Sequence, residues 1–214
     1  MNVKHKDYPD RESWLAGRQG GIGASEASCV MGCGFTSATQ LWKEKTGNAP
    51  HADLSDNKRV QYGNDAEPIL RALFALQFKD KYEVTYNAYR IYRSEEYPFL
   101  TATLDGELKE IESERYGVLE IKTAWITSKY DLEQWSGQIP QKYYVQVLHQ
   151  MAVTNASFAT VMAQLIMPDG DSEIKIFRFE RDGREKEIKY VVEQEAKFWK
   201  YIENGEEPPI TLTL

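Results

Sequence analysis

The spacing of apolar positions predicts four helices in the first third of the chain. Asp10 is placed to cap a short first helix that ends near Arg18, and Ser25 stands where the N-cap of a second helix is expected. The third helix is closed by Gly47. The predicted ranges are about 11–18, 27–31, 38–45 and 66–78.

The start of the fourth helix is set by a proline. Because Pro68 is tolerated within a first turn, this helix is expected to begin at about Ala66, with Asn64 or Asp65 as its N-cap. Its apolar residues recur at helical spacing and predict one buried face. They are Ile69, Leu70, Leu73 and Phe74.

β-Branched and aromatic residues dominate five later segments, which are predicted as strands. The charged stretch 109–115 is expected to form a hairpin, and 124–140 an irregular loop long enough to be functional. Helices at about 141–153 and 184–202 complete the pattern of an α/β fold with a mixed central sheet flanked by helices. The predicted strands are 82–92, 99–104, 117–123, 158–166 and 173–179.

Length and composition fit one folded unit. The chain has 214 residues, of which 42% are hydrophobic and 28% are charged. We expect a single domain over residues 1–214, with a helical part at about 10–80 and a sheet with helices at about 81–205. No apolar run is long enough to span a bilayer and the start lacks a signal-peptide core, so a cytoplasmic protein without a membrane partner is expected. Cys29 and Cys33 are expected as reduced thiols.

The formal net charge of −7 argues at first sight against a nucleic-acid partner, because contacts to phosphate dominate such binding. Acidic residues around a metal count against that total, however, and basic residues can gather on one face. The charge therefore weakens a nucleic-acid function without excluding it.

Two acids and a lysine carry the most informative chemistry. Glu120 and Lys122 lie two residues apart on a predicted strand, so their side chains share a face while Ile121 points into the core. If Asp105 arrives on a neighbouring strand, two carboxylates and one cation converge, which suits Mg²⁺ and a phosphodiester. This pattern predicts hydrolysis of nucleic acid.

Six blocks of sequence follow one another in a specific order. They are Arg18 with Gly-Ile-Gly-Ala-Ser-Glu-Ala at 21–27, Leu-Trp-Lys-Glu-Lys-Thr-Gly at 41–47, Gly-Asn-Asp-Ala-Glu at 63–67, Leu-Asp-Gly at 104–106, Leu-Glu-Ile-Lys-Thr at 119–123 and Tyr-Val-Gln-Val-Leu-His-Gln-Met at 144–151. In this order the blocks resemble those of the YqaJ-like viral recombinase nucleases, the phage lambda exonuclease family. The match covers about residues 14–165, and six ordered blocks are far more specific than any one of them.

The resemblance implies a restriction-endonuclease-like fold of the PD-(D/E)xK type and a Mg²⁺-dependent exonuclease, with Mn²⁺ as a substitute metal. Such an enzyme degrades one strand of double-stranded DNA in the 5′→3′ direction from a 5′-phosphorylated end. Family members act with a single-strand annealing protein in phage-type recombination, and the lambda-like ones form a homotrimer ring around DNA. A phage or prophage origin and action in the cytoplasm of a bacterial host follow from the same resemblance.

The resemblance also implies which residues form the metal centre. Asp105 and Glu120 take the metal-ligand places together with the backbone carbonyl of Ile121, and Lys122 takes the place of the catalytic lysine. Beside two carboxylates Lys122 should be an ammonium that orients water and stabilises the phosphate, the alternative being a neutral base. Leu104 departs from the family pattern, which has a proline before the first acid.

Five further positions match the family's site. Arg18 and Ser25 match the residues that bind the terminal 5′ phosphate, which Arg18 can grip in a bidentate manner. Glu67 and Gln146 match catalytic residues carried on helices. Thr103 stands where the lambda-like pattern has a serine that contacts DNA.

Other functions remain compatible with the residues. The same scaffold could support a Mg²⁺-dependent endonuclease or a single-strand-specific nuclease, because the metal site and the mode of cutting are separable. A non-catalytic DNA-recombination adaptor is a further alternative, although carboxylates that face a phosphate would contribute little to a protein that only binds DNA. Trp125 and Trp135 either pack in the core or stack on unpaired bases. His149 is interpreted as a partly buried polar residue.

Overall fold

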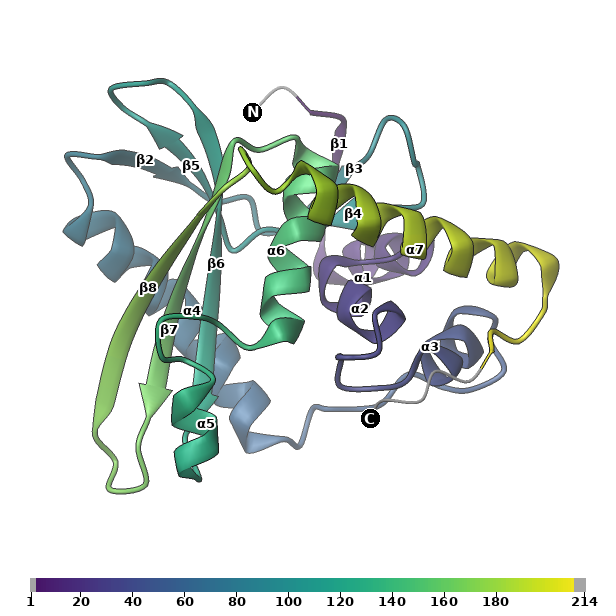
Figure 1. Ribbon diagram of the computed structural model, residues 1–214, viewed down its shortest axis with the longest axis horizontal. Helices are drawn as coiled ribbons and strands as arrows, with labels where there is room; N and C mark the ends of the chain where they lie inside the picture. Colours follow the sequence, from purple (N-terminus) through teal and green to yellow (C-terminus); the bar gives the residue numbers. More distant parts are fainter. Residues whose placement is uncertain (1–2, 210–214) are drawn as a thin grey trace.

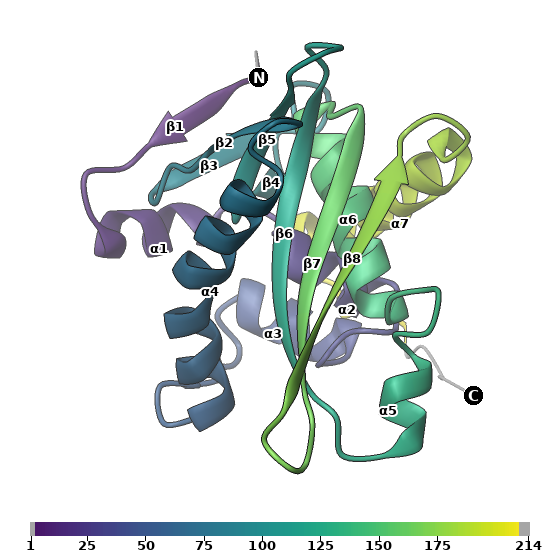
Figure 2. The same cartoon turned by 90° about the vertical axis from the view of Figure 1, so that its left-hand side faces the viewer.

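The computed structural model describes residues 3–209 and has the predicted α/β architecture, with helices on both faces of a mixed sheet (Figures 1 and 2). The elements are β1 (His5–Asp7), α1 (Arg11–Gln19), α2 (Ala24–Val30), α3 (Ala38–Lys45), α4 (Lys58–Gln77), β2 (Tyr82–Thr85), β3 (Arg90–Arg93), β4 (Thr101–Ala102), β5 (Gly106–Glu110), β6 (Tyr116–Trp125), α5 (Lys129–Glu133), α6 (Gln141–Thr154), β7 (Phe158–Ile166), β8 (Ser172–Glu180) and α7 (Glu185–Asn204).

The main sheet has five strands in the order β2-β5-β6-β7-β8. Strands β6 and β7 are parallel and the other neighbouring pairs are antiparallel, so the sheet is mixed as predicted. The parallel pair is possible because α6 forms the crossover between β6 and β7. A smaller sheet, β1-β3-β4, lies beside the main one.

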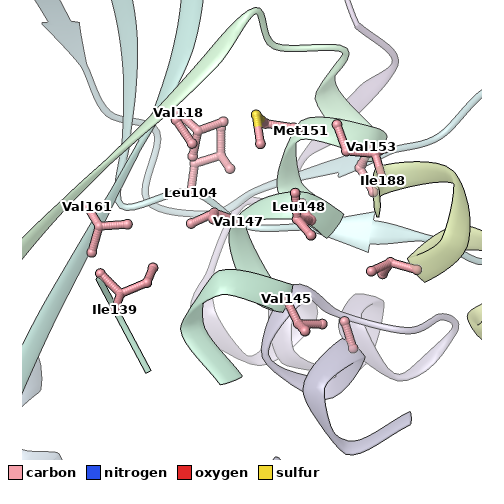
Figure 3. Close-up of a cluster of buried hydrophobic side chains, with 14 of the residues drawn as sticks. Leu104, Val118, Ile139, Val145, Val147, Leu148, Met151, Val153, Val161 and Ile188 are labelled. Carbon is pink, nitrogen blue, oxygen red and sulfur yellow. The ribbon is translucent and has the colours of Figure 1, made fainter. Parts of the chain in front are cut away.

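The two faces of β6 belong to two apolar clusters. Val118 packs with the cluster around α6, whereas Leu119 and Ile121 pack with the cluster around α4. Figure 3 shows part of the first cluster, in which Val118 and Val161 of the sheet lie near Val147 of α6. The alternation of side chains along a strand therefore sends Glu120 and Lys122 toward α6, as the sequence predicts.

Helix α7 packs over α6 and the N-terminal helices (Figure 1). Its stripe of buried residues includes Ile188, Val191 and Phe198, which confirms the apolar face predicted for this helix. Gly205 ends the helix with φ of 68°, a left-handed conformation that favours glycine. Helices from both ends of the chain therefore share one core, and the prediction of a single domain over 1–214 stays a prediction.

Two predicted helix starts are wrong. The N-cap of α2 is Gly23 and not Ser25, because the carboxylate of Glu26 accepts the Gly23 amide at 2.7 Å and fixes the first turn. Helix α4 begins at Lys58, because the side chain of Asn57 accepts from the amides of its first turn. Pro68 therefore lies inside α4, and neither Asn64 nor Asp65 is a cap.

The strands between residues 82 and 110 also differ from the prediction. The segment 82–92 is not one strand, because β2 pairs with β5 in the main sheet while β3 pairs with β1 and β4 in the small one. The strand predicted over 99–104 is reduced to β4. Lys109 and Glu110 belong to β5 and not to the hairpin turn, which is shorter than predicted. The short β1 and α5 were not predicted.

Two further predictions concern the cysteines and membrane-spanning segments. Cys29 and Cys33 are free thiols, as expected. None of the helices in the described part of the chain has both the length and the apolar character needed to cross a membrane.

Candidate active site

A cleft of about 890 Å³ opens at the edge of the main sheet, between α4 and α6. Its walls come from α1, α2, α4, the segment before β5, the second half of β6, α5 and the start of α6. Segments that lie far apart in the sequence therefore meet in one cavity. All nine residues assigned to the site from the sequence line it: Arg18, Ser25, Glu67, Thr103, Asp105, Glu120, Ile121, Lys122 and Gln146.

The hairpin of β5 and β6 brings the two acids level with each other. Gly106 pairs with Leu119, so Asp105 lies opposite Glu120, one residue beyond the last pair of the ladder. The Asp105 Oδ2 atom accepts the amide of Ile121 at 2.7 Å and thus replaces a strand partner. Because the amide and carbonyl of one strand residue point to the same edge, the carbonyl of Ile121 faces the side on which Asp105 lies.

Glu120 is held by donors on both carboxylate oxygens. Its side chain is 2% exposed, and Lys122 Nζ lies 2.5 Å from its Oε1 atom. Gln146 donates to the same oxygen at 2.6 Å, and Gln150 donates to Oε2. Both glutamines lie on α6, one turn apart, so a single helix face fixes the orientation of this carboxylate.

Burial and neighbouring charges shift the pKa values of Asp105 and Lys122. Burial, with a further contribution from Glu120, raises the pKa of Asp105 well above its ordinary value, and the smaller opposing effect of Lys122 does not cancel this. Burial alone would lower the pKa of Lys122, but the carboxylates of Glu120 and Asp105 outweigh it and raise the pKa. Lys122 is therefore an ammonium at neutral pH, as predicted.

Glu67 reaches the cleft from α4 and is paired with an arginine. Arg71 Nη1 lies 2.9 Å from Glu67 Oε1 and also donates to the backbone carbonyl of Asp105 at 2.6 Å. The Arg71 guanidinium packs 3.4 Å from the centre of the Tyr86 ring. Arg71 thus ties α4 to the turn that carries Asp105.

Arg18 is a half-buried cation that lines the same cleft. Its guanidinium packs over the Trp14 ring at 4.8 Å, and burial lowers its pKa from the ordinary value. Within residues 3–209 it has no ion pair or hydrogen bond to a side chain, so its donors are available to an anion. Ser25 is exposed in the first turn of α2, and it lines the same cavity together with Thr103.

Sequence reasoning missed two residues of this site. Gln150 follows Gln146 by four residues on one helical face, and this spacing is a signal from which its role could be inferred. Arg71 follows Glu67 by the same spacing, but its contact with the Asp105 carbonyl joins segments that local patterns cannot relate. Of the two tryptophans considered, Trp135 is a core residue, whereas Trp125 is exposed on the rim of the cleft.

Asp105 and Glu120 have no third acidic side chain close enough to complete a metal site within the described residues. Across residues 3–209 no group of three or more His, Cys, Asp or Glu side chains could hold a metal ion. A cation between Asp105 and Glu120 would therefore need a backbone oxygen such as the Ile121 carbonyl as its third protein donor.

This fold and the placement of its acids define the PD-(D/E)xK type. A family model described as the YqaJ-like viral recombinase domain matches residues 13–157, and the chain belongs to this family. The uncharacterized protein YqaJ of Bacillus subtilis (strain 168) is 30% identical over 191 residues, which cover 88% of this chain and 55% of that protein. The chain thus spans about half the length of this curated relative.

Solved structures share the fold at lower identity. An alkaline exonuclease (LHK-Exo) from Laribacter hongkongensis superimposes with a TM-score of 0.67 at 23% identity, covering 91% of this chain and 95% of that one. Its complex with dAMP gives a TM-score of 0.68. A phage-related exonuclease from Haemophilus somnus 129PT gives 0.59 at 13% identity, covering 86% and 96% of the two chains.

Proposed function

We propose that the chain is a Mg²⁺-dependent 5′→3′ exonuclease that degrades one strand of double-stranded DNA from a 5′-phosphorylated end. The observation that carries this proposal is the convergence of all nine assigned residues on one cleft. Two groups of different chemistry line that cleft: the acidic pair with a lysine, and an arginine whose donors could bind an anion. This is the arrangement that cleavage close to a phosphorylated end requires.

The donors fit a Mg²⁺ ion. Two carboxylates and one carbonyl suffice, because Mg²⁺ prefers oxygen ligands and keeps several waters, and Mn²⁺ accepts the same donors. The raised pKa of Asp105 supports this, since a carboxylate crowded by Glu120 and Glu67 calls for more positive charge than Lys122 supplies. When bound, the ion would lower the pKa of a water and neutralise charge on the phosphodiester.

The other side chains position and stabilise. Lys122, as an ammonium fixed by Glu120, would stabilise the negative charge that develops on the phosphate during attack. Gln146 offers an uncharged donor and acceptor beside the reacting group. Glu67, oriented by Arg71, would accept a hydrogen bond from a water in the cleft.

The preference for an end follows from Arg18. A terminal 5′ phosphate carries charge that an internal phosphodiester lacks, and a guanidinium binds it in a bidentate manner. Ser25 would add a hydroxyl donor, and Thr103 would contact the same strand. Each cleavage exposes a new 5′ phosphate, which the same residues would draw forward.

The mode of cutting is tested with linear and covalently closed circular duplexes of the same sequence. We expect an end-labelled linear duplex to be shortened from its 5′ ends in Mg²⁺ and the closed circle to remain intact. Nicking of the circle would identify an endonuclease, and degradation of single strands alone a single-strand-specific nuclease. Cleavage that occurs in Mg²⁺ and is lost in EDTA identifies a nuclease of any of these kinds, whereas a non-catalytic adaptor would cleave DNA under neither condition.

Arg18→Ala is expected to remove the preference for a 5′ phosphate. Charge-assisted hydrogen bonds to the terminal phosphate contribute about 2 kcal/mol, so the wild type should favour a 5′-phosphorylated end over a 5′-hydroxyl end about thirtyfold. Initial rates on the two ends provide the measurement. Arg11→Ala, at the exposed start of the same helix and outside the cleft lining, is the matched control and should keep the preference. Equal rates on both ends with the wild type would overturn the assignment of Arg18 and Ser25.

Gln150→Leu is expected to weaken Mn²⁺ or Mg²⁺ binding about tenfold, because residues that orient a ligating group typically contribute this much to metal affinity. The variant leaves Glu120 Oε2 without its amide donor. Calorimetric titration of the metal measures the effect, with the exposed Gln77→Leu of α4 as control. An unchanged affinity would show that Gln146 and Lys122 hold Glu120 without help.

Assembly and partners belong to the same proposal. We infer that the chain forms a homotrimer ring around DNA and has a single-strand annealing recombinase as its partner. We also infer that it acts in the bacterial cytoplasm, in phage-type recombination. The support is membership of the viral recombinase family and the sequence resemblance. Light scattering of the purified chain tests the trimer directly.

A further inference from the structure

Three exposed aromatic side chains line the cleft. Phe35 lies between α2 and α3, Trp125 at the end of β6 and Tyr130 on α5, and all three line the cavity. Their exposed fractions are 73%, 39% and 68%. Phe35 is the one exposed phenylalanine and Trp125 the one exposed tryptophan among residues 3–209. Single exposed rings are ordinary, but three from separate segments on one cleft indicate a binding surface.

Cations accompany these rings. Lys142 Nζ lies 4.0 Å from the centre of the Phe35 ring, and the Arg59 guanidinium lies 5.8 Å from the Trp125 ring. Asp131, an acid that lines the same cleft, accepts hydrogen bonds from the Thr127 amide and hydroxyl and the hydroxyl of Ser128, so its charge is used within its own turn. The cleft therefore offers apolar rings and positive charge together.

The Trp125 ring is held in place although it is exposed. Tyr62 packs against it edge to face at 5.8 Å, and the Tyr62 hydroxyl donates to Gln164 Oε1 at 3.0 Å. A fixed ring loses little entropy when a flat ligand covers it. Trp125 follows Lys122 by three residues on β6, so the two side chains leave opposite faces of the strand and Trp125 points toward Tyr62 and Arg59 of α4. The rise along the strand between them is about 10 Å, which corresponds to about three nucleotides of a stacked strand.

We propose that Phe35, Trp125 and Tyr130, with Arg59 and Lys142, form a subsite that stacks on unpaired nucleobases of the strand whose phosphate lies at the acids. A base inside a duplex has both faces covered by its neighbours, whereas an unpaired base can present a face to each ring that it meets. Stacking is available to every base, so the subsite binds single-stranded nucleotides without choosing a sequence. The inference rests on the proposed function only in placing DNA in this cleft.

The test is the binding of duplexes that end in a short 5′-phosphorylated overhang, either intact or with its bases removed to leave abasic sugars. Fluorescence anisotropy in EDTA reports binding without cleavage. We expect the wild type to bind the intact overhang about tenfold more tightly than the abasic one, as stacking on an aromatic residue would give. Trp125→Ala and Phe35→Ala should each reduce that ratio, and the double variant should bring it close to one.

Two controls make the outcome decisive. Tyr190→Ala removes an exposed ring of α7 outside the cleft and should keep the wild-type ratio. Trp125→Phe retains a stacking face and should keep most of it, which separates stacking from a folding defect. A variant that weakens intact and abasic overhangs equally, or a wild type that binds both alike, overturns the subsite. A wild type that binds neither DNA contradicts the proposed function instead.

Discussion

Replacing Asp105 by asparagine is expected to lower the rate of DNA cleavage at least about a thousandfold. The variant keeps an oxygen that can accept the Ile121 amide, so the hairpin geometry at 2.7 Å is retained. It removes the negative charge that would hold a divalent ion beside Glu120. Loss of about 4 kcal/mol of transition-state stabilisation by the metal corresponds to this factor.

The same variant should be more stable than the wild type when no metal is present. An acid whose pKa is raised in the folded state binds more protons folded than unfolded, so stability falls as pH rises from the ordinary pKa of 3.8 through the raised value. At neutral pH the ionised Asp105 therefore destabilises the metal-free fold. Thermal unfolding in EDTA should show a higher Tm for Asp105→Asn, and addition of Mg²⁺ should raise the Tm of the wild type more.

Asp80→Asn supplies the control, because this acid is exposed in the turn after α4 and outside the cleft. It should leave both the cleavage rate and the Mg²⁺-dependent change in Tm unaltered. Cleavage by Asp105→Asn at the wild-type rate would remove the basis of the metal-centre assignment. An unchanged Tm in EDTA would instead contradict the account of its raised pKa.

The convergence of Asp105, Glu120 and Lys122 could be predicted because it depends on short-range rules. The i and i+2 rule places Glu120 and Lys122 on one face of β6, and a hairpin of a few residues returns Asp105 to that face. The alternation of apolar and polar residues that marks Glu120 and Lys122 as strand residues can be read directly from the sequence. Gln146 was assigned from the resemblance, and the helix period places Gln150 one turn further on the same face of α6.

The errors lie where structure depends on distant partners. The segment 82–92 is rich in strand formers throughout, but Tyr82 pairs with Glu110 while Arg90 pairs with Asp7, so two sheets divide it. The role of Arg71 depends in the same way on the distant carbonyl of Asp105. At α4, Pro68 was taken as a start signal, but tertiary packing of the helix on β6 tolerates it in the interior.

His149 of α6 and Glu195 of α7 form a buried pair. His149 Nδ1 lies 2.6 Å from Glu195 Oε1 of α7, its Nε2 donates to the Thr101 carbonyl at 2.9 Å, and both side chains are 0% exposed. Burial alone would lower the pKa of His149, but Glu195 and the Thr101 carbonyl outweigh it and raise the pKa. This pair fixes the helix that presents Gln146 and Gln150 to Glu120.

Glu195→Gln is expected to lower the free energy of unfolding by about 3 kcal/mol, because breaking a buried pair leaves the remaining partner without its counter-charge. For a chain of this length the Tm should fall by about 10 °C. Thermal unfolding measures the change. Glu193→Gln on the same helix, whose carboxylate is half exposed and 3.8 Å from Lys189, should change stability by less than about 0.5 kcal/mol.

The pH dependence distinguishes this pair from simple packing. A histidine whose pKa is raised on folding binds more protons folded than unfolded, so its stabilisation is complete below the unfolded value of 6.5 and is lost as pH rises through the folded value. The difference in stability between the wild type and Glu195→Gln should therefore be largest below pH 6.5 and shrink above it. A difference that is constant across this range would mean that Glu195 acts through shape alone. Replacing both His149 and Glu195 by leucine should recover part of the lost stability, because two apolar groups need no counter-charge.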